Sequence, residues 1–481
     1  MSVKKNLAYN FLLSLGGVLF PLLSIPWLSR VLDPAGLGRV QFTDGLTYYF
    51  IALAEAGIVA HAVRAVARQR SDPAGMRVLV SELLSLHLVT SVLSMIGYGI
   101  ALYLLYGRIG DGRLVACGIS FLLLNGFACE WYFWGTENFR YIALRSLLVR
   151  ALALAALFVL VRAPEHYAYY YGIIVASAAA ILLLNLARMI RETGVSFRAL
   201  SWKRHLRVTR VTYAISLVYS IPLLLDNVLL GVLAGTAAVA FYAFAAKIVR
   251  LLGALVTDAF LVLYPRSVAL QQEGSAAAAR GLQLSAEGLL LFAVPVSAGI
   301  WIVADAFTDV YFGPRFGPVA PHLRVLALYP LLNAAALFFN KQVLMPRDRE
   351  RDVLHGLIGG AAVFVGSALL LCPRLGGIGM AWSLVAGEAA ALLLQYGFSC
   401  RAGGIVLMIR RPVLYSIAAA LALFVGIGWG AGRLGLNPPA YLALVVPSCA
   451  AAYLIVLLFF RPEPWQIALA ALRKPSTHAA S

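Results

Sequence analysis

Residues 441–460 read YLALVVPSCAAAYLIVLLFF, a run of 20 residues without one charged side chain. An α-helix needs about 20 mostly apolar residues to cross the hydrocarbon core of a bilayer, so this run is long enough to span a membrane. It does not alternate between apolar and polar residues, as the strands of a membrane β-barrel do. The run therefore predicts a transmembrane helix.

Runs of this kind recur along most of the 481 residues. Hydrophobic residues make up 62% of the chain and charged residues 12%, whereas soluble domains typically contain about 25% charged residues. The sequence thus predicts an all-α polytopic membrane protein with about 14 transmembrane helices. The expected spans are residues 10–29, 40–60, 79–106, 114–134, 143–161, 168–187, 211–233, 238–263, 284–304, 321–345, 352–372, 378–398, 412–431 and 440–460.

The distribution of basic residues predicts the orientation. Lys4 and Lys5 precede an apolar run containing Pro21 and Pro26, without a small-x-small cleavage site, so we expect a retained first helix rather than a signal peptide. When loops are assigned alternately to the two sides, most of the 39 lysines and arginines fall on the side of Lys4 and Lys5. The positive-inside rule makes this side cytoplasmic, with both termini inside.

The most basic segment, residues 188–210, separates two groups of six expected spans. We expect an N-terminal lobe at 1–187, a basic cytoplasmic linker at 188–210, a C-terminal lobe at 211–400, and two extra helices with a cytoplasmic tail at 401–481. The net charge of +18 follows from the topology and from attraction to anionic membrane lipids, so no nucleic-acid partner is expected.

Motifs of catalysis and metal binding are missing from the sequence. It contains no phosphate-binding glycine loop, CxxC pair, HExxH or GxSxG. The five cysteines lie within or next to spans, without metal-like spacing, as small packing residues do. We therefore expect a protein that is not an enzyme and that holds no metal or cofactor.

Three cations, Arg150, Lys247 and Arg250, lie inside otherwise apolar spans. A cation in the hydrocarbon core costs about 2.5–3.5 kcal/mol on insertion scales, so such residues usually face a wet interior. They predict a polar passage whose cargo is anionic. Lys247 and Arg250 are three residues apart and thus neighbours on one helix, where they could hold phosphate or carboxylate groups. The alternative is that one reaches the interface or is neutralised by a helix neighbour.

Two acidic residues could complete this site. Asp226 is expected at a depth similar to that of Lys247, where it could form an ion pair or, alternatively, carry a proton that couples transport to a gradient. Asp258 lies eleven residues after Lys247, on the same expected face, and could line the cavity or pair with Arg250. Glu55, Glu82, Glu130 and Glu388 are each expected to pair with a nearby arginine.

A second basic group is expected at the cytoplasmic mouth. Arg145 and Arg150 lie at the start of the fifth span, with Arg140 just before it, where an anionic headgroup would enter. The alternative is that they only follow the inside-positive bias. Arg30 is expected at the outer end of the first span, where contact with lipid headgroups and release of substrate are comparable interpretations.

Several motifs resemble those of one family. They are Asn6-x-x-x-Asn10 followed by Leu-Asp-Pro-Ala-Gly-Leu-Gly at 32–38, EWYFWGTENFRYI at 130–142, Asn340 to Pro346, and GGIGMAW at 376–382 followed by Glu388. Together they resemble the bacterial polysaccharide flippases of the Wzx type, within the multidrug/oligosaccharidyl-lipid/polysaccharide exporter superfamily.

The resemblance implies two six-helix lobes that form a V and open alternately to the two sides, plus a C-terminal helix pair. It implies a substrate of short oligosaccharide on undecaprenyl diphosphate, carried across a bacterial inner membrane for O-antigen, capsule or exopolysaccharide synthesis. A polysaccharide polymerase and a chain-length regulator are the implied partners. The alternatives are a lipid II flippase, a multidrug exporter of the same superfamily and, more remotely, a membrane glycosyltransferase.

Overall fold

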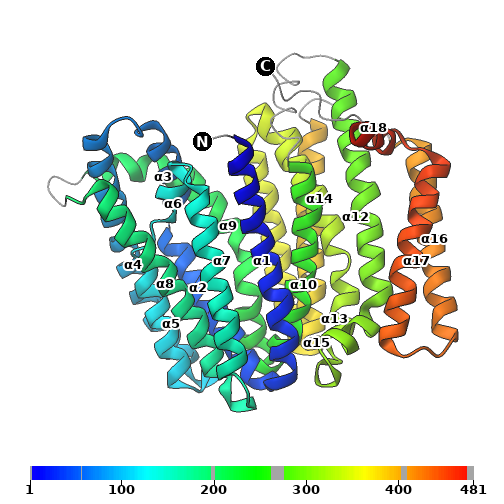
Figure 1. The fold of residues 1–481 in the computed structure, drawn as a ribbon, viewed down its shortest axis with the longest axis horizontal. Helices are drawn as coiled ribbons and strands as arrows, with labels where there is room; N and C mark the ends of the chain where they lie inside the picture. The colour runs from blue at the N-terminus through cyan, green and yellow to red at the C-terminus, as the bar shows by residue number, and fades with distance from the viewer. Residues whose placement is uncertain (1–2, 56, 197–200, 262–275, 402–408, 474–481) are drawn as a thin grey trace. The chain divides into compact units, whose positions relative to one another are not determined.

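The computed structural model describes residues 3–55, 57–196, 201–261, 276–401 and 409–473. Within these ranges every regular element is a helix or helical turn (Figure 1). The helices are α1 (Val3–Val31), α2 (Pro34–Glu55), α3 (Ile58–Arg68), α4 (Pro73–Ile109), α5 (Gly112–Asn125), α6 (Glu130–Gly135), α7 (Phe139–Leu160), α8 (Tyr167–Thr193), α9 (Lys203–Ala234), α10 (Thr236–Leu261), α12 (Ala276–Tyr311), α13 (Val319–Leu326), α14 (Tyr329–Phe338), α15 (Glu350–Arg401), α16 (Arg411–Arg433), α17 (Pro438–Phe460) and α18 (Glu463–Arg473).

The described helices confirm the all-α polytopic class. Ten of them are long and apolar enough to cross a membrane, or eleven if the bent pair of α2 and α3 is one span. α15 contains two of the predicted spans, 352–372 and 378–398, because its backbone breaks at Gly376 with φ 55° and ψ −132°. A positive φ has little steric cost for glycine. The count of 14 spans stays a prediction.

Two predicted spans, 40–60 and 114–134, each contain a break that the sequence analysis did not anticipate. The first lies between α2 and α3, where Gly57 has φ 71°. There the hydroxyl of Thr90 on α4 donates to the carbonyl oxygen of Ala54 at 2.6 Å, which satisfies an acceptor at the end of α2. The second lies between α5 and α6. At the first break a tertiary contact therefore replaces a hydrogen bond that a continuous helix would make.

By packing, the chain forms two compact units, Met1–Ala243 and Phe244–Ser481, so α10 begins in the first and continues in the second. α8 extends into the predicted linker as far as Thr193, and α9 begins at Lys203. The predicted lobe boundaries at 187, 210 and 400 stay a prediction.

In the first unit α2 packs against α4, α5, α8 and α9, and α1 packs against α7. Pro34 opens α2, and the N–H of Gly36 donates to Asp33 Oδ2 at 3.0 Å, so the motif at 32–38 is a helix-start signal. Gly38 lies against the start of α10, since a Cβ built on it would be 1.8 Å from the carbonyl oxygen of Thr236. The motif therefore has a structural role.

In the second unit α16 and α17 pack side by side and both contact α12 (Figure 1). Phe424, Val445 and Cys449 form a buried cluster there, with Ile302 of α12 packed against it. A second cluster joins α10, α12 and α14 around Val256. Burial of these apolar side chains away from lipid and water ties the last two long helices to the rest of the unit.

Candidate functional site: charged residues within the helical bundle

Arg250 and Lys247 lie one turn apart on α10, as their spacing predicts. Arg250 is half-buried and Lys247 is exposed. One turn after Arg250, a Cβ built on Gly253 would lie 3.4 Å from the ring of Tyr329 on α14. Arg250 is therefore at the level where α10 and α14 pack together.

A carboxylate from α15 lies in the same region. Asn333 of α14 donates through Nδ2 to Glu388 Oε2 at 3.2 Å. Glu388 is also close enough to Arg250 for an electrostatic interaction. An opposite charge lowers the cost of placing a guanidinium among apolar helices. The pairing of Glu388 with an arginine stays a prediction, with Arg250 as the candidate partner.

Asp226 is completely buried on α9. Its carboxylate accepts hydrogen bonds from the hydroxyl of Tyr242 at 2.9 Å and from the N–H of Asn227 at 2.6 Å. Asp226 belongs to the first unit and Lys247 to the second, so their ion pair stays a prediction, as does a proton-carrying role. The side chain of Asp258 lies outside the described residues.

Arg145 is buried in the first unit and joins three helices. Its guanidinium donates to Glu130 Oε1 of α6 at 3.0 Å, to the amide oxygen of Asn185 on α8, and to Ser146 Oγ at 3.0 Å. The prediction that Glu130 pairs with an arginine is confirmed. These contacts are those of a residue that fixes the packing of α6, α7 and α8.

We expect Arg145→Lys to lower the free energy of unfolding by about 1.5–3 kcal/mol, since a lysine cannot reach all three acceptors with a planar fork. The thermal unfolding midpoint of the purified protein measures this. Arg140→Lys is the matched control, because Arg140 is an exposed residue of the same helix. Equal midpoints for the two variants would assign Arg145 no structural role.

Arg150 and Arg30 make different contacts. Arg150 is half-buried on α7, and its Nη1 donates to the carbonyl oxygen of Leu13 on α1 at 3.1 Å. A Cβ built on Gly16 would lie 3.1 Å from the same nitrogen. The absence of a side chain at Gly16 therefore lets the guanidinium of Arg150 pack against α1. Arg30 is exposed and donates to the carbonyl oxygen of Pro26 on its own helix at 2.8 Å.

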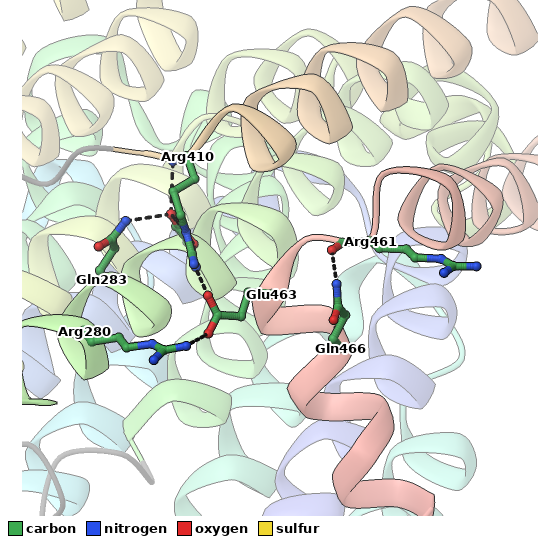
Figure 2. Close-up of polar contacts among 7 residues, drawn as sticks. Arg280, Gln283, Arg410, Arg461, Glu463 and Gln466 are labelled. Carbon is green, nitrogen blue, oxygen red and sulfur yellow. Dashed lines mark hydrogen bonds and ion pairs between the residues drawn. The ribbon is translucent and has the colours of Figure 1, made fainter.

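A third charged cluster, between α12, α16 and α18, was missed by the sequence analysis (Figure 2). Glu287 of α12 is completely buried, and it accepts from Arg410 Nε at 2.8 Å and from the N–H of Arg410 at 3.0 Å. Arg410 also contacts Glu463 of α18, which accepts from Arg280 at 2.5 Å. These hydrogen bonds, from Arg280 and then Arg410, hold the pKa of Glu463 below its ordinary range.

Membrane-spanning helices with charged residues buried among them define a polytopic membrane protein with a polar interior. Residues 3–271 match the family described as "Polysaccharide biosynthesis protein". This match covers more than half of the sequence, and the chain belongs to that family. The family resemblance predicted from the motifs is confirmed.

Known proteins extend the comparison over most of the chain. Over 400 residues the chain is 22% identical to "Putative O-antigen transporter" of Shigella dysenteriae, an alignment that covers 82% of this chain and 99% of that protein. Among solved structures, the lipid II flippase MurJ matches with a TM-score of 0.70 at 12% identity, covering 95% of this chain and 98% of that one. An inward-facing MATE multidrug transporter matches with a TM-score of 0.62 at 20% identity, covering 80% and 94%. These structures show a shared fold.

Proposed function

We propose that this protein is a flippase that moves oligosaccharide repeat units linked to undecaprenyl diphosphate from the cytoplasmic to the outer face of a bacterial inner membrane. The repeat units would serve the synthesis of O-antigen, capsule or exopolysaccharide. The alignment along nearly the whole O-antigen transporter of Shigella dysenteriae carries this proposal. Membership of the polysaccharide biosynthesis family supports it.

The charged residues supply a mechanism for an anionic cargo. A diphosphate cannot cross hydrocarbon without compensating charge. Arg250 offers planar paired donors and Lys247 a mobile point charge, one turn apart on α10. In this proposal they hold the diphosphate during alternating access, and Arg150 and Arg30 act at the two mouths. Arg145 supports the first unit through its contacts with α6 and α8.

The alternatives predict different cargo. A lipid II flippase shares the lipid diphosphate, and the MurJ match supports that fold without assigning the substrate. A multidrug exporter of the same fold would be expected to carry cationic compounds, which the cations of α10 disfavour. A membrane glycosyltransferase would use acidic residues in catalysis. The proposed flippase needs no catalytic residue, so the two functions differ in what they require of the acidic side chains. Polymerase and chain-length regulator proteins are the proposed partners.

Complementation tests the proposal. In a bacterium that lacks its polysaccharide flippase, we expect the wild-type protein to restore surface glycan. Arg250→Ala should lower the restored glycan at least about tenfold at equal membrane expression, since one charge-assisted contact is worth about 1.5–3 kcal/mol. Lys247→Ala should have a smaller effect in the same direction, because a contact made by a solvent-exposed ammonium contributes less than one made by a half-buried guanidinium.

Arg351→Ala is the matched control, since Arg351 is an exposed arginine near the start of α15. Equal rescue by wild type and all variants would keep the flippase and remove the α10 cations from its mechanism. Rescue of a strain lacking its lipid II flippase, without rescue of the polysaccharide strain, would reassign the substrate.

A further inference from the structure

Three titratable side chains from three helices form a hydrogen-bonded chain in the first unit. His205 Nε2 on α9 lies 2.9 Å from Glu82 Oε2 on α4, and His205 Nδ1 lies 2.8 Å from His61 Nε2 on α3. The side chains of His205 and Glu82 are 4% and 2% exposed, and His61 is half-buried. The chain thus runs from a buried carboxylate to an imidazole nearer the surface.

The same carboxylate holds the segment that enters α9. The N–H of Ser201 donates to Glu82 Oε1 at 3.0 Å, and Trp202 Nε1 donates to Ser85 Oγ, one turn along α4, at 2.9 Å. The Trp202 ring packs against the buried cluster formed by α3, α4 and α6. Glu82 is therefore the point at which α4, the entry of α9 and the His205 imidazole meet.

This arrangement does not fit a metal ion. His205 uses both ring nitrogens, one toward each neighbour, so Glu82 and His61 cannot converge on a single ion. A zinc ligand would also hold nitrogen about 2.0–2.1 Å from the metal, whereas here the groups contact one another directly. Within the described part of the chain no group of three potential ligands has metal-binding geometry. The ligand that suits these three hydrogen-bonded side chains is a proton.

We propose that His61, His205 and Glu82 form a proton-binding site that controls how firmly the entry of α9 is attached to α4. Two proton arrangements keep both hydrogen bonds. In one, His61 Nε2–H donates to His205 Nδ1 while His205 Nε2–H donates to Glu82. In the other, one proton more is bound, both nitrogens of His205 donate, and His61 accepts through Nε2 while its Nδ1 carries the hydrogen.

The second arrangement strengthens the attachment. Its extra proton puts a positive charge on His205, so the bond to His61 changes from neutral to charge-assisted, and such bonds are about twice as strong as neutral ones. The bond to Glu82, whose acceptor is ionised in both arrangements, becomes an ion pair. Histidine is the side chain whose ordinary proton exchange falls between about pH 5 and 8, so this is the range in which the site is tested. The proton-bound form is populated at the acid end and lost as the pH rises. The entry of α9 should therefore be held more firmly at low pH.

Other charged or titratable groups lie on the helices around this site and contribute to its electrostatic potential. They include Glu55 at the end of α2, Arg64 and Arg68 on α3, Arg77 on α4, Tyr132 on α6, Arg188 and Glu192 on α8, and Lys203 and Arg204 next to His205 in the sequence. Arg64 is exposed, and Arg77 donates to the carbonyl oxygen of Val195 at 3.4 Å. Glu192 accepts from Arg188 and Tyr132. The side chains of Lys203 and Arg204 lie outside the described residues.

Hydrogen–deuterium exchange of the full-length protein in lipid nanodiscs tests the site. The peptide containing Trp202 and His205 is followed at about pH 5.5 and about pH 8.5, with correction for the intrinsic rate. We expect its protection to be about fivefold greater at the acid pH, since one neutral hydrogen bond becomes charge-assisted. Equal protection of the wild type at the two pH values would overturn the proposal.

Variants assign the effect to these residues. Glu82→Gln and His205→Gln should each remove the pH dependence, and His61→Gln should reduce it. His355→Gln, an exposed histidine of the second unit, should keep it. Retention of the wild-type dependence in Glu82→Gln would overturn the proposal. The wild-type measurement decides it even where a variant does not fold, and because no substrate is involved the result is independent of the proposed function.

Discussion

Arg410→Ala should destabilise the second unit by about 3 kcal/mol, the lower end of the cost of removing one partner from a buried ion pair. Glu287 is 0% exposed and accepts three hydrogen bonds from side-chain nitrogens of Arg410, so the variant leaves a buried carboxylate without its guanidinium. The Arg410 side chain is 34% exposed, and water entering its place limits the loss. The lowered thermal unfolding midpoint of purified protein in detergent is the measurement.

Two matched variants separate this effect from a general loss of charge. Arg280→Ala removes the second guanidinium that contacts Glu463 (Figure 2), but its side chain is 71% exposed, so we expect less than about 1 kcal/mol. Arg410→Ala combined with Glu287→Ala should recover part of the stability, because the unpartnered carboxylate is gone. A single variant as stable as the wild type would show that Glu287 is satisfied by other groups.

The membrane fold could be predicted from the sequence because apolar runs of about 20 residues form transmembrane α-helices in a bilayer. The breaks after α2 and α5 were not accessible, because neither contains a proline. The break after α2 is stabilised by a partner from another helix, the hydroxyl of Thr90, which donates to the carbonyl of Ala54. Local sequence cannot show that such a partner will be present.

The candidate site could be predicted from the sequence only where a charged residue lies within an apolar span or close to an opposite charge in the sequence. Arg250 and Lys247 stand out in an apolar span, and Glu130 lies close enough to Arg145 in sequence for a pairing to be expected. His205 and Glu82 are 123 positions apart, as are Arg410 and Glu287, and no periodicity links either pair. Only the packing of the helices brings these residues together.

The glycines of the family motifs, and Asp33, mark turns, a helix start and close packing where the structure describes them. Gly376 has the positive φ at which α15 breaks, and Gly135 lies against Val66 of α3. At the motif of residues 32–38, Asp33 caps α2 and Gly38 lies against the start of α10. The resemblance therefore identified the fold through positions that form turns, a helix start and close helix contacts.

Gly38→Ala should consequently have the largest effect of any small substitution in this motif. Its Cβ would lie 1.8 Å from the carbonyl oxygen of Thr236 and 2.7 Å from the carbonyl carbon. A backbone group cannot move aside as a flexible side chain can, so α2 and the start of α10 must separate. Overpacking a well-packed site typically costs about 1–3 kcal/mol and occasionally more, and we expect the upper end here.

The amount of folded, membrane-inserted protein and its thermal unfolding midpoint both measure this cost. Gly99→Ala is the matched control, because α4 also lies in the first unit and a Cβ at this position meets nothing within 4 Å. Without a clash, the change from glycine to alanine within a helix is expected to stabilise by about 1 kcal/mol. The two substitutions should therefore have opposite signs. If Gly38→Ala matched the control, α2 and α10 would not be in contact at this point, and the structural account of the motif would be wrong.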